Sequence, residues 1–250
     1  MNEPWNIKTD DTRKADSKPT FIIFCEDEVS EPIYFKYFET PNIQVNPIKN
    51  QKSKVDNVFK AICYCENNDL MTKKGTKSFL KNKNPQVWCV FDRDLENEDP
   101  KIQIGNVSFD ESINTAKSKG IKVAWSNDAF ELWILLHFED VDLANADNKN
   151  RITYYNRLTE IFKSLKNPNN DLIKVLTHQS FSYKQDFKHE NNFRNIVRPE
   201  IVGKTKIAIE RAKKLEKHFK SPNIPNHEKA PCTLVHHLVE ELIKTGGKKI

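Results

Sequence analysis

The sequence lacks the features that mark fibrous, low-complexity and membrane proteins. Only 6 of its 250 residues are glycine, and the 12 prolines are scattered along the chain. No apolar run approaches the roughly 20 residues that a membrane-spanning helix needs, so we expect no contact with a membrane. Residues 1–18 are polar and have no apolar signal core, which predicts a flexible N-terminal arm and a cytoplasmic protein.

Cysteines with the spacing of a disulfide framework or a zinc site are also missing. The chain has an odd number of them, mostly inside apolar segments: Cys25, Cys63, Cys65, Cys89 and Cys232. This pattern argues for reduced thiols in a cytosol. The G-x-x-x-x-G-K-S/T loop of nucleotide-hydrolysing proteins is absent as well, so any ATPase that the function needs would be a separate partner protein.

Positive charge gathers in one part of the chain. The formal net charge is +5, and residues 184–220 carry 11 Lys and Arg against 5 Asp and Glu, whereas residues 1–183 have a small negative excess. Such a segment either holds the phosphates of a nucleic acid or solvates the outer faces of helices. If it holds phosphates, the candidate bases are Lys184, Lys188, Arg194, Arg198, Lys204 and Lys206.

Four apolar or alternating segments predict strands at residues 20–25, 43–48, 87–91 and 121–125. Helical patterns separate them, one of which begins with Ser30 as the expected N-cap and Pro32 in its first turn. Strands that alternate with helices predict an α/β fold with a mostly parallel, doubly wound sheet, flanked by helices. The Lys- and Asn-rich residues 72–85 are expected to form a loop.

The last part of the chain reads as helical. Residues 141–150 are polar and mark a boundary, after which apolar stripes with helical spacing occur within residues 154–165, 208–219 and 234–242. We therefore expect an α/β core over residues 19–140 and a helical C-terminal region over residues 141–250 that packs on it.

Acidic residues follow two of the predicted strands at the point where each strand ends. Glu26 comes after the first strand, and Asp92 and Asp94 come after the third. The carboxyl ends of parallel strands meet at one edge of a sheet, where ligands bind. Carboxylate oxygens there suit Mg²⁺ or Mn²⁺, so Glu26, Asp92 and Asp94 are candidate metal ligands and catalytic residues. The alternative is that they only cap the following helices. Glu31, in the first turn of the next predicted helix, is expected to interact with the helix dipole rather than to bind a metal.

Further polar residues follow the fourth predicted strand. Asp128 and Glu131 have the spacing of a capping box, which needs no metal, but Asn127 and Glu131 are also additional candidates for the same site. His137 lies in an apolar segment and is expected to be a buried core histidine. His236 and His237 have glutamates four residues later, but no third ligand is evident, and we expect an exposed helix face.

Two resemblances narrow the fold and the function. The spacing from Glu26 to Asp92 and Asp94 resembles the Toprim domain, the metal-binding module of topoisomerases, bacterial primases and several nucleases. Asp27 stands where those proteins usually have glycine. A closer resemblance, to RloB-like proteins, extends over residues 20–243 and is carried by residues 21–26, 30–35, 90–94, 126–138 and 233–242.

The RloB-like resemblance implies a Toprim-like, Rossmann-like sheet and a metal-dependent nuclease with a role in bacterial antiphage defence by abortive infection. It also favours Lys184, next to Tyr183, as the lysine that binds the scissile phosphate. The substrate would be RNA, with tRNA as one candidate, or DNA. The alternatives are a non-catalytic nucleic-acid-binding or regulatory subunit that works with an ATPase, or an enzyme that processes nucleotides. The sequence leaves open whether the chain forms a homo-oligomer.

Overall fold

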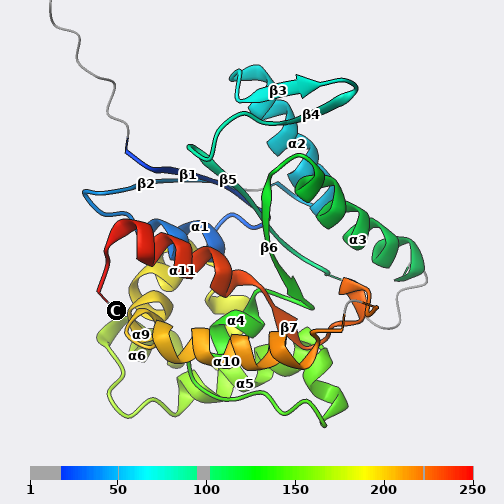
Figure 1. Ribbon diagram of the computed structural model, residues 1–250. Helices are drawn as coiled ribbons and strands as arrows, with labels where there is room; N and C mark the ends of the chain where they lie inside the picture. The colour runs from blue at the N-terminus through cyan, green and yellow to red at the C-terminus, as the bar shows by residue number, and fades with distance from the viewer. Residues whose placement is uncertain (1–17, 50, 95–101, 222, 250) are drawn as a thin grey trace, which may run out of the picture.

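The computed structural model describes residues 18–49, 51–94, 102–221 and 223–249 (Figure 1). The expected N-terminal arm, apart from Lys18, lies outside the described residues. Within the described part of the chain, no helix has both the length and the apolar character required to cross a membrane. The five cysteines all lie in this part and are all free.

A five-stranded sheet with the order β2-β1-β5-β6-β7 forms the centre of the molecule. The first four strands in this order are parallel, and β7 runs antiparallel to β6, so the prediction of a mostly parallel sheet is confirmed. The fifth strand was not expected, because it is contributed by the C-terminal region. The strands are β1 (Thr20–Cys25), β2 (Gln44–Ile48), β5 (Gln86–Asp92), β6 (Lys122–Asn127) and β7 (Cys232–Thr233).

Helices cover both faces of the sheet, which explains why β1 and β5 are continuously apolar. Alternate side chains of β1 enter two separate cores: Phe21 and Ile23 point to one, Ile22 and Phe24 to the other. One core contains α2 and α3, and the other contains α1, α4 and α11, as the two layers in Figure 1 show. These helices are α1 (Ser30–Lys36), α2 (Lys54–Asn67), α3 (Ile102–Ser118), α4 (Glu131–Leu135) and α11 (Val235–Gly246).

The C-terminal part is helical, as predicted, and its apolar stripes enter the same core as α1 and α4. The expected stripes correspond to α5, α10 and α11. Short 3-10 and π-helical turns (η1, η2 and η3) connect the longer helices. The elements of this part are η1 (Ala146–Lys149), α5 (Arg151–Lys163), α6 (Asn170–Leu176), α7 (Tyr183–Asp186), α8 (Glu190–Asn192), η2 (Phe193–Val197), α9 (Arg198–Val202), α10 (Thr205–His218) and η3 (Asn226–Glu228).

The prediction of a loop over residues 72–85 is wrong for the first half of that segment. Strands β3 (Met71–Lys74) and β4 (Lys77–Leu80) form an antiparallel hairpin, with Gly75 at φ 63° in the turn between them. Each strand has four residues, and β3 ends in two exposed lysines. A short hairpin that pairs only with itself needs few apolar residues, so its composition resembles that of a loop.

His137 is a buried core histidine, as predicted, with 1% of its surface exposed. Its Nδ1 donates to the carbonyl oxygen of Trp133 at 2.9 Å, and its Nε2 lies 3.3 Å from the Tyr34 hydroxyl. Burial lowers the pKa of His137 to about 3, so the imidazole stays neutral and satisfied within the core.

Candidate functional site

The ends of β1 and β5 place Glu26 and Asp92 side by side. The backbone N–H of Glu26 donates to the Val90 carbonyl at 3.2 Å, and Glu26 Oε2 accepts a hydrogen bond from the Asp92 backbone at 2.7 Å. The buried amide of Asn57 fixes the two strand ends by donating to the carbonyl oxygens of Phe24 and Val90, at 3.0 and 2.9 Å. The structure thus brings together two of the three candidate ligands.

One oxygen of Asp92 has no partner. Its Oδ2 accepts from the backbone N–H of Phe130 at 2.9 Å, whereas its Oδ1 is buried and has no hydrogen-bond partner among the described residues. Burial, followed by the negative charges of Glu26 and Glu131, raises the pKa of Asp92 well above its usual range. A buried carboxylate oxygen without a partner is costly, and a bound cation would remove that cost.

Glu26, Glu31 and Asp92 lie at the carboxyl ends of β1 and β5 and the start of the following helix, and we call this group the carboxylate rim. The pKa values of Glu26 and Glu31 are raised, like that of Asp92. Burial raises the pKa of Glu26 to about 7 against the opposing hydrogen bond from Asp92, and the charge of Asp94 adds to the rise. Glu31, only 1% exposed, has its pKa raised by burial and by the charges of Asp27 and Asp92. Glu31 therefore lies within the electrostatic field of the rim, beyond the helix-dipole role expected for it.

Asp27 caps α1, and the expected role of Ser30 as the N-cap is wrong. The Asp27 carboxylate accepts backbone hydrogen bonds from Val29, Ser30 and Glu31 at 3.1–3.2 Å. Val29 is the N-cap residue, and Ser30 is already the first residue of the helix. Asp27 thus satisfies free N–H groups of the first turn.

Asp94 turns toward Arg151 rather than toward the other acids. Its backbone is left-handed, at φ 52°, and its carboxylate pairs with the Arg151 guanidinium, which also binds both oxygens of Asp128 at 2.9 and 3.1 Å. Among the described residues, the oxygens of Glu26, Asp92 and Asp94 do not all lie within 4.8 Å of one another. The assignment of Asp94 as a metal ligand stays a prediction.

The capping box proposed for Asp128 and Glu131 is wrong. Helix α4 begins at Glu131 with Phe130 as its N-cap residue and no side-chain cap, and Asp128 is held by Arg151. Asn127 is fully buried, and its amide donates to the carbonyl oxygens of His227 and Asn226 at 2.9 and 3.3 Å. Asn127 therefore links η3 to the end of β6.

Glu131 faces the carboxylate rim and is paired with a lysine from the C-terminal region. Glu131 is 1% exposed, and its charge contributes to the raised pKa of Asp92. Lys188 forms an ion pair with Glu131 and approaches Asp27 to 3.9 Å. Burial opposes the charge on Lys188, but Glu131 and Asp27 outweigh it and raise the pKa of Lys188 well above its usual range. Lys188 therefore remains a cation at the rim.

The other predicted bases lie elsewhere. The Nζ of Lys184 is 5.6 Å from the centre of the Tyr155 ring, and that of Lys204 is 4.2 Å from the Phe138 ring. Arg194 pairs with Glu190, whereas Arg198 is half-buried and Lys206 is exposed. Of the six predicted bases, Lys188 is the one that reaches the carboxylates.

Two cations at the rim were missed by the sequence argument. Lys54, the first residue of α2, donates to the Arg93 carbonyl at 2.8 Å, and its charge lowers the pKa of Glu26. Arg151, the first residue of α5, neutralises Asp94 and Asp128. Neither lies near the acids in sequence, so only the packing of the helices against the strand ends reveals them.

The motifs that carry the strand-end acids are matched by a known family. The sequence profile described as RloB-like protein matches residues 21–242. The chain belongs to the RloB-like family. The resemblance seen in the sequence is therefore confirmed over most of the chain, and the acidic rim of this RloB-like protein lies within the matched residues. No curated protein and no solved structure matches the chain.

Proposed function

We propose that this RloB-like protein is a Mg²⁺- or Mn²⁺-dependent nuclease of the Toprim type that acts in bacterial antiphage defence. The observation that carries the proposal is the buried Asp92 Oδ1, which has no hydrogen-bond partner among the described residues, in a residue whose backbone N–H donates to the carboxyl group of Glu26. Membership of the RloB-like family fits a defence-associated protein.

The donor set at the rim suits such an ion. Glu26 and Asp92 offer only carboxylate oxygens, the ligands that Mg²⁺ and Mn²⁺ prefer. These two residues would hold the ion, which when bound would neutralise charge on a phosphate and activate water. Asp94 is the third expected ligand, but its carboxylate pairs with Arg151. Burial and the charges of neighbouring carboxylates raise the pKa of both Glu26 and Asp92, which supports a cation beside them.

The substrate in this proposal is a nucleic acid, either RNA, including tRNA, or DNA. Lys188, between α7 and α8, and Lys54, at the start of α2, lie near the carboxylates, which supports a role for both in holding phosphates. The predicted bases at Lys184, Arg194, Arg198, Lys204 and Lys206 would hold more distant phosphates, and binding through them would weaken with salt. A cytoplasmic location belongs to the same proposal.

Cleavage of a mixed panel of substrates tests this function. Total tRNA, single-stranded RNA, plasmid and single-stranded DNA are each incubated with Mg²⁺, Mn²⁺ or EDTA and the full chain. We expect cleavage that requires the metal and is lost in Glu26→Gln and Asp92→Asn but retained in Glu111→Gln, whose side chain is exposed on α3. Cleavage that persists in both rim variants would exclude the rim as the catalytic centre.

One observation favours a second candidate function, a non-catalytic subunit that works with an ATPase partner. The ion pairs of Arg151 with Asp94 and of Lys188 with Glu131 neutralise acids without any metal. In that case the rim would be a structural network, and the protein would bind nucleic acid through its bases. Binding that depends on salt but not on Mg²⁺, without cleavage in the presence of the partner, would support this alternative.

A further inference from the structure

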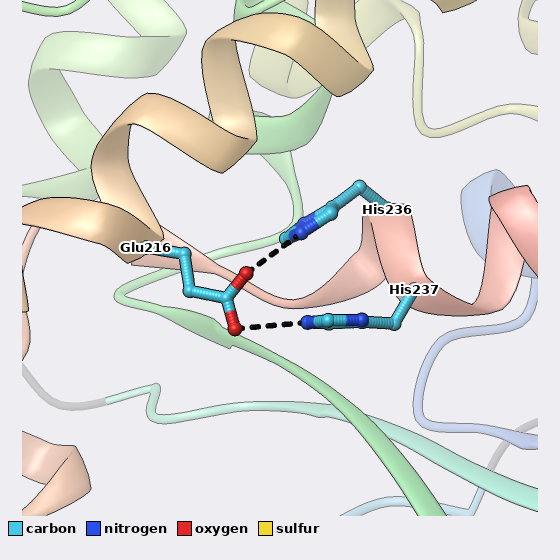
Figure 2. A group of neighbouring side chains, drawn as sticks. All are labelled: Glu216, His236 and His237. Carbon is cyan, nitrogen blue, oxygen red and sulfur yellow. Dashed lines mark hydrogen bonds and ion pairs between the residues drawn. The ribbon is translucent and has the colours of Figure 1, made fainter. Parts of the chain in front are cut away.

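A second group of ligand-type side chains lies away from the carboxylate rim, between α10 and α11. Figure 2 shows Glu216 of α10 reaching toward His236 and His237, near the start of α11. Glu216 Oε2 is 3.0 Å from His236 Nε2, and Glu216 Oε1 is 2.9 Å from His237 Nε2. The expected exposed face is wrong for His236, which is fully buried, and Glu216 is a third ligand-type side chain that the sequence did not reveal.

A neutral His236 imidazole has too few protons for the two hydrogen-bond acceptors that face it. Both ring nitrogens face acceptors, because Nδ1 lies 3.2 Å from the Thr233 carbonyl and Nε2 lies 3.0 Å from the Glu216 carboxylate. A neutral imidazole carries one proton and can donate to only one of them. If Nδ1 donates to Thr233, the lone pair of Nε2 points at a carboxylate oxygen.

The side chain of His236 is fully buried, and Glu216 approaches it from α10. A divalent cation between Nε2 and the carboxylate would turn the conflict into two metal–ligand bonds. The Thr233 carbonyl would then be the usual second partner that fixes the tautomer of a metal-bound histidine.

We propose that Glu216, His236 and His237 form a binding site for Zn²⁺ or a similar divalent transition metal. The three ligand atoms all lie within 4.8 Å of one another. Ligands about 2.0–2.1 Å from a tetrahedral zinc lie roughly 3.3 Å apart, close to the 3.0 and 2.9 Å between the Glu216 oxygens and the two imidazole nitrogens. Two imidazole nitrogens and one carboxylate are a common ligand set for zinc and a poor one for Mg²⁺.

The site is open on one side. Glu216 and His237 have side chains 36% and 46% exposed, whereas His236 forms the buried floor. Solvent can therefore reach the ion and occupy a fourth position. The ion would join α10 to α11 beside β7, whose Thr233 hydroxyl lies 3.1 Å from that of Ser126 at the end of β6.

Metal titration of the full, untagged chain tests the site. We expect one equivalent of Zn²⁺ to bind in calorimetry, and Co²⁺ to give visible absorption bands typical of a tetrahedral site. Glu216→Gln and His237→Ala should weaken Zn²⁺ binding by about tenfold or more, since each removes one ligand. Both side chains are partly exposed, so we expect the variants to fold, and circular dichroism verifies this.

Matched controls separate this site from other ligands. Glu210→Gln and His218→Ala change exposed residues of α10 and should leave Zn²⁺ affinity within about twofold. Asp92→Asn, which changes a proposed ligand of the carboxylate rim, should also leave the Zn²⁺ affinity unchanged. The proposal is overturned if the wild-type chain binds no stoichiometric Zn²⁺, or if folded His237→Ala binds it with unchanged affinity. A doubly protonated His236 at neutral pH, detected by nitrogen NMR in the presence of Zn²⁺, would overturn it as well.

Discussion

The carboxylate rim and the Glu216–His236–His237 group both gather ionisable side chains, but they differ in the atoms that they offer. The rim offers oxygens alone, and one of them, Asp92 Oδ1, has no partner among the described residues. The second group offers two nitrogens and one carboxylate that already contact one another. The difference teaches that clustering alone does not indicate an ion: the donor atoms of the rim suit Mg²⁺ or Mn²⁺, and those of the second group suit Zn²⁺.

The two places also differ in how the chain builds them. The rim collects the ends of parallel strands, with cations added from α2, α5 and the segment after α7. The other group joins two helices of the C-terminal part. The first is a general property of α/β sheets, and the second is particular to the packing of this chain.

The largest effect is expected when the rim loses a ligand. Asp92→Asn should lower the Mg²⁺-dependent cleavage rate by about 10³-fold, since a bound ion supplies several kcal/mol of transition-state stabilisation. The free energy of unfolding in EDTA should not fall, because the change removes a charge from a buried position. Single-turnover cleavage and urea denaturation measure the two quantities. A variant that loses stability and activity together would indicate a structural role for Asp92.

The next largest effect is expected on stability, when Arg151, the partner of Asp94 and Asp128, is replaced. Arg151→Met should lower the free energy of unfolding by about 3 kcal/mol, because it removes the guanidinium that pairs with the buried carboxylate of Asp128, 3% exposed. Arg157→Met is the matched control: Arg157 also pairs with two carboxylates but is 46% exposed, so the loss should stay below about 1 kcal/mol. Equal losses in the two variants would contradict the account.

His137 is a reference for a buried histidine that contacts carbonyl oxygens rather than a carboxylate. Its pKa of about 3 in the folded chain lies below the unfolded value of roughly 6.5, so the stability it contributes is lost as the pH falls through this window. Urea denaturation at pH 6.5, 5.5 and 4.5 should show a loss of up to about 1.4 kcal/mol per pH unit that His137→Gln removes. The exposed His218→Gln should leave the slope unchanged; parallel profiles for wild type and His137→Gln would refute the assignment.

The smallest effect is expected at the edge of the second group when no metal is present. His237→Ala in EDTA should change the free energy of unfolding by less than about 1 kcal/mol, because the side chain is nearly half exposed. Thermal denaturation with and without Zn²⁺ measures this. If the metal-free loss is larger, the hydrogen bonds of the group contribute to the fold by themselves, and the contrast with the rim becomes weaker.

The strand pattern and the rule for strand ends account for what the sequence predicted. The apolar runs before Glu26 and Asp92 indicated buried parallel strands, and the structure places these acids at one rim. The hairpin β3–β4 was missed because its strands are short and polar. Strand β7 was missed because two residues are too few to show an alternating pattern.

Long-range packing accounts for what the sequence did not reveal. Arg151 lies 57 residues after Asp94, and Lys188 lies 57 residues after Glu131, so no local pattern links the partners of either pair. The histidine pair was noticed, but Glu216 precedes it by 20 residues on another helix. The capping pattern at Asp128 and Glu131 was misleading, because Arg151 and Lys188 bind those carboxylates instead.

Metal selectivity tests the central claim, that the carboxylate rim is the centre for a hard divalent cation. Mn²⁺ and Zn²⁺ binding are measured by calorimetry on wild type, Glu26→Gln, Asp92→Asn, Glu216→Gln and His237→Ala. The account predicts that the two rim variants lose Mn²⁺ binding and keep Zn²⁺ binding, while the other two variants show the reverse. Mn²⁺ binding to Asp92→Asn with wild-type affinity would contradict it.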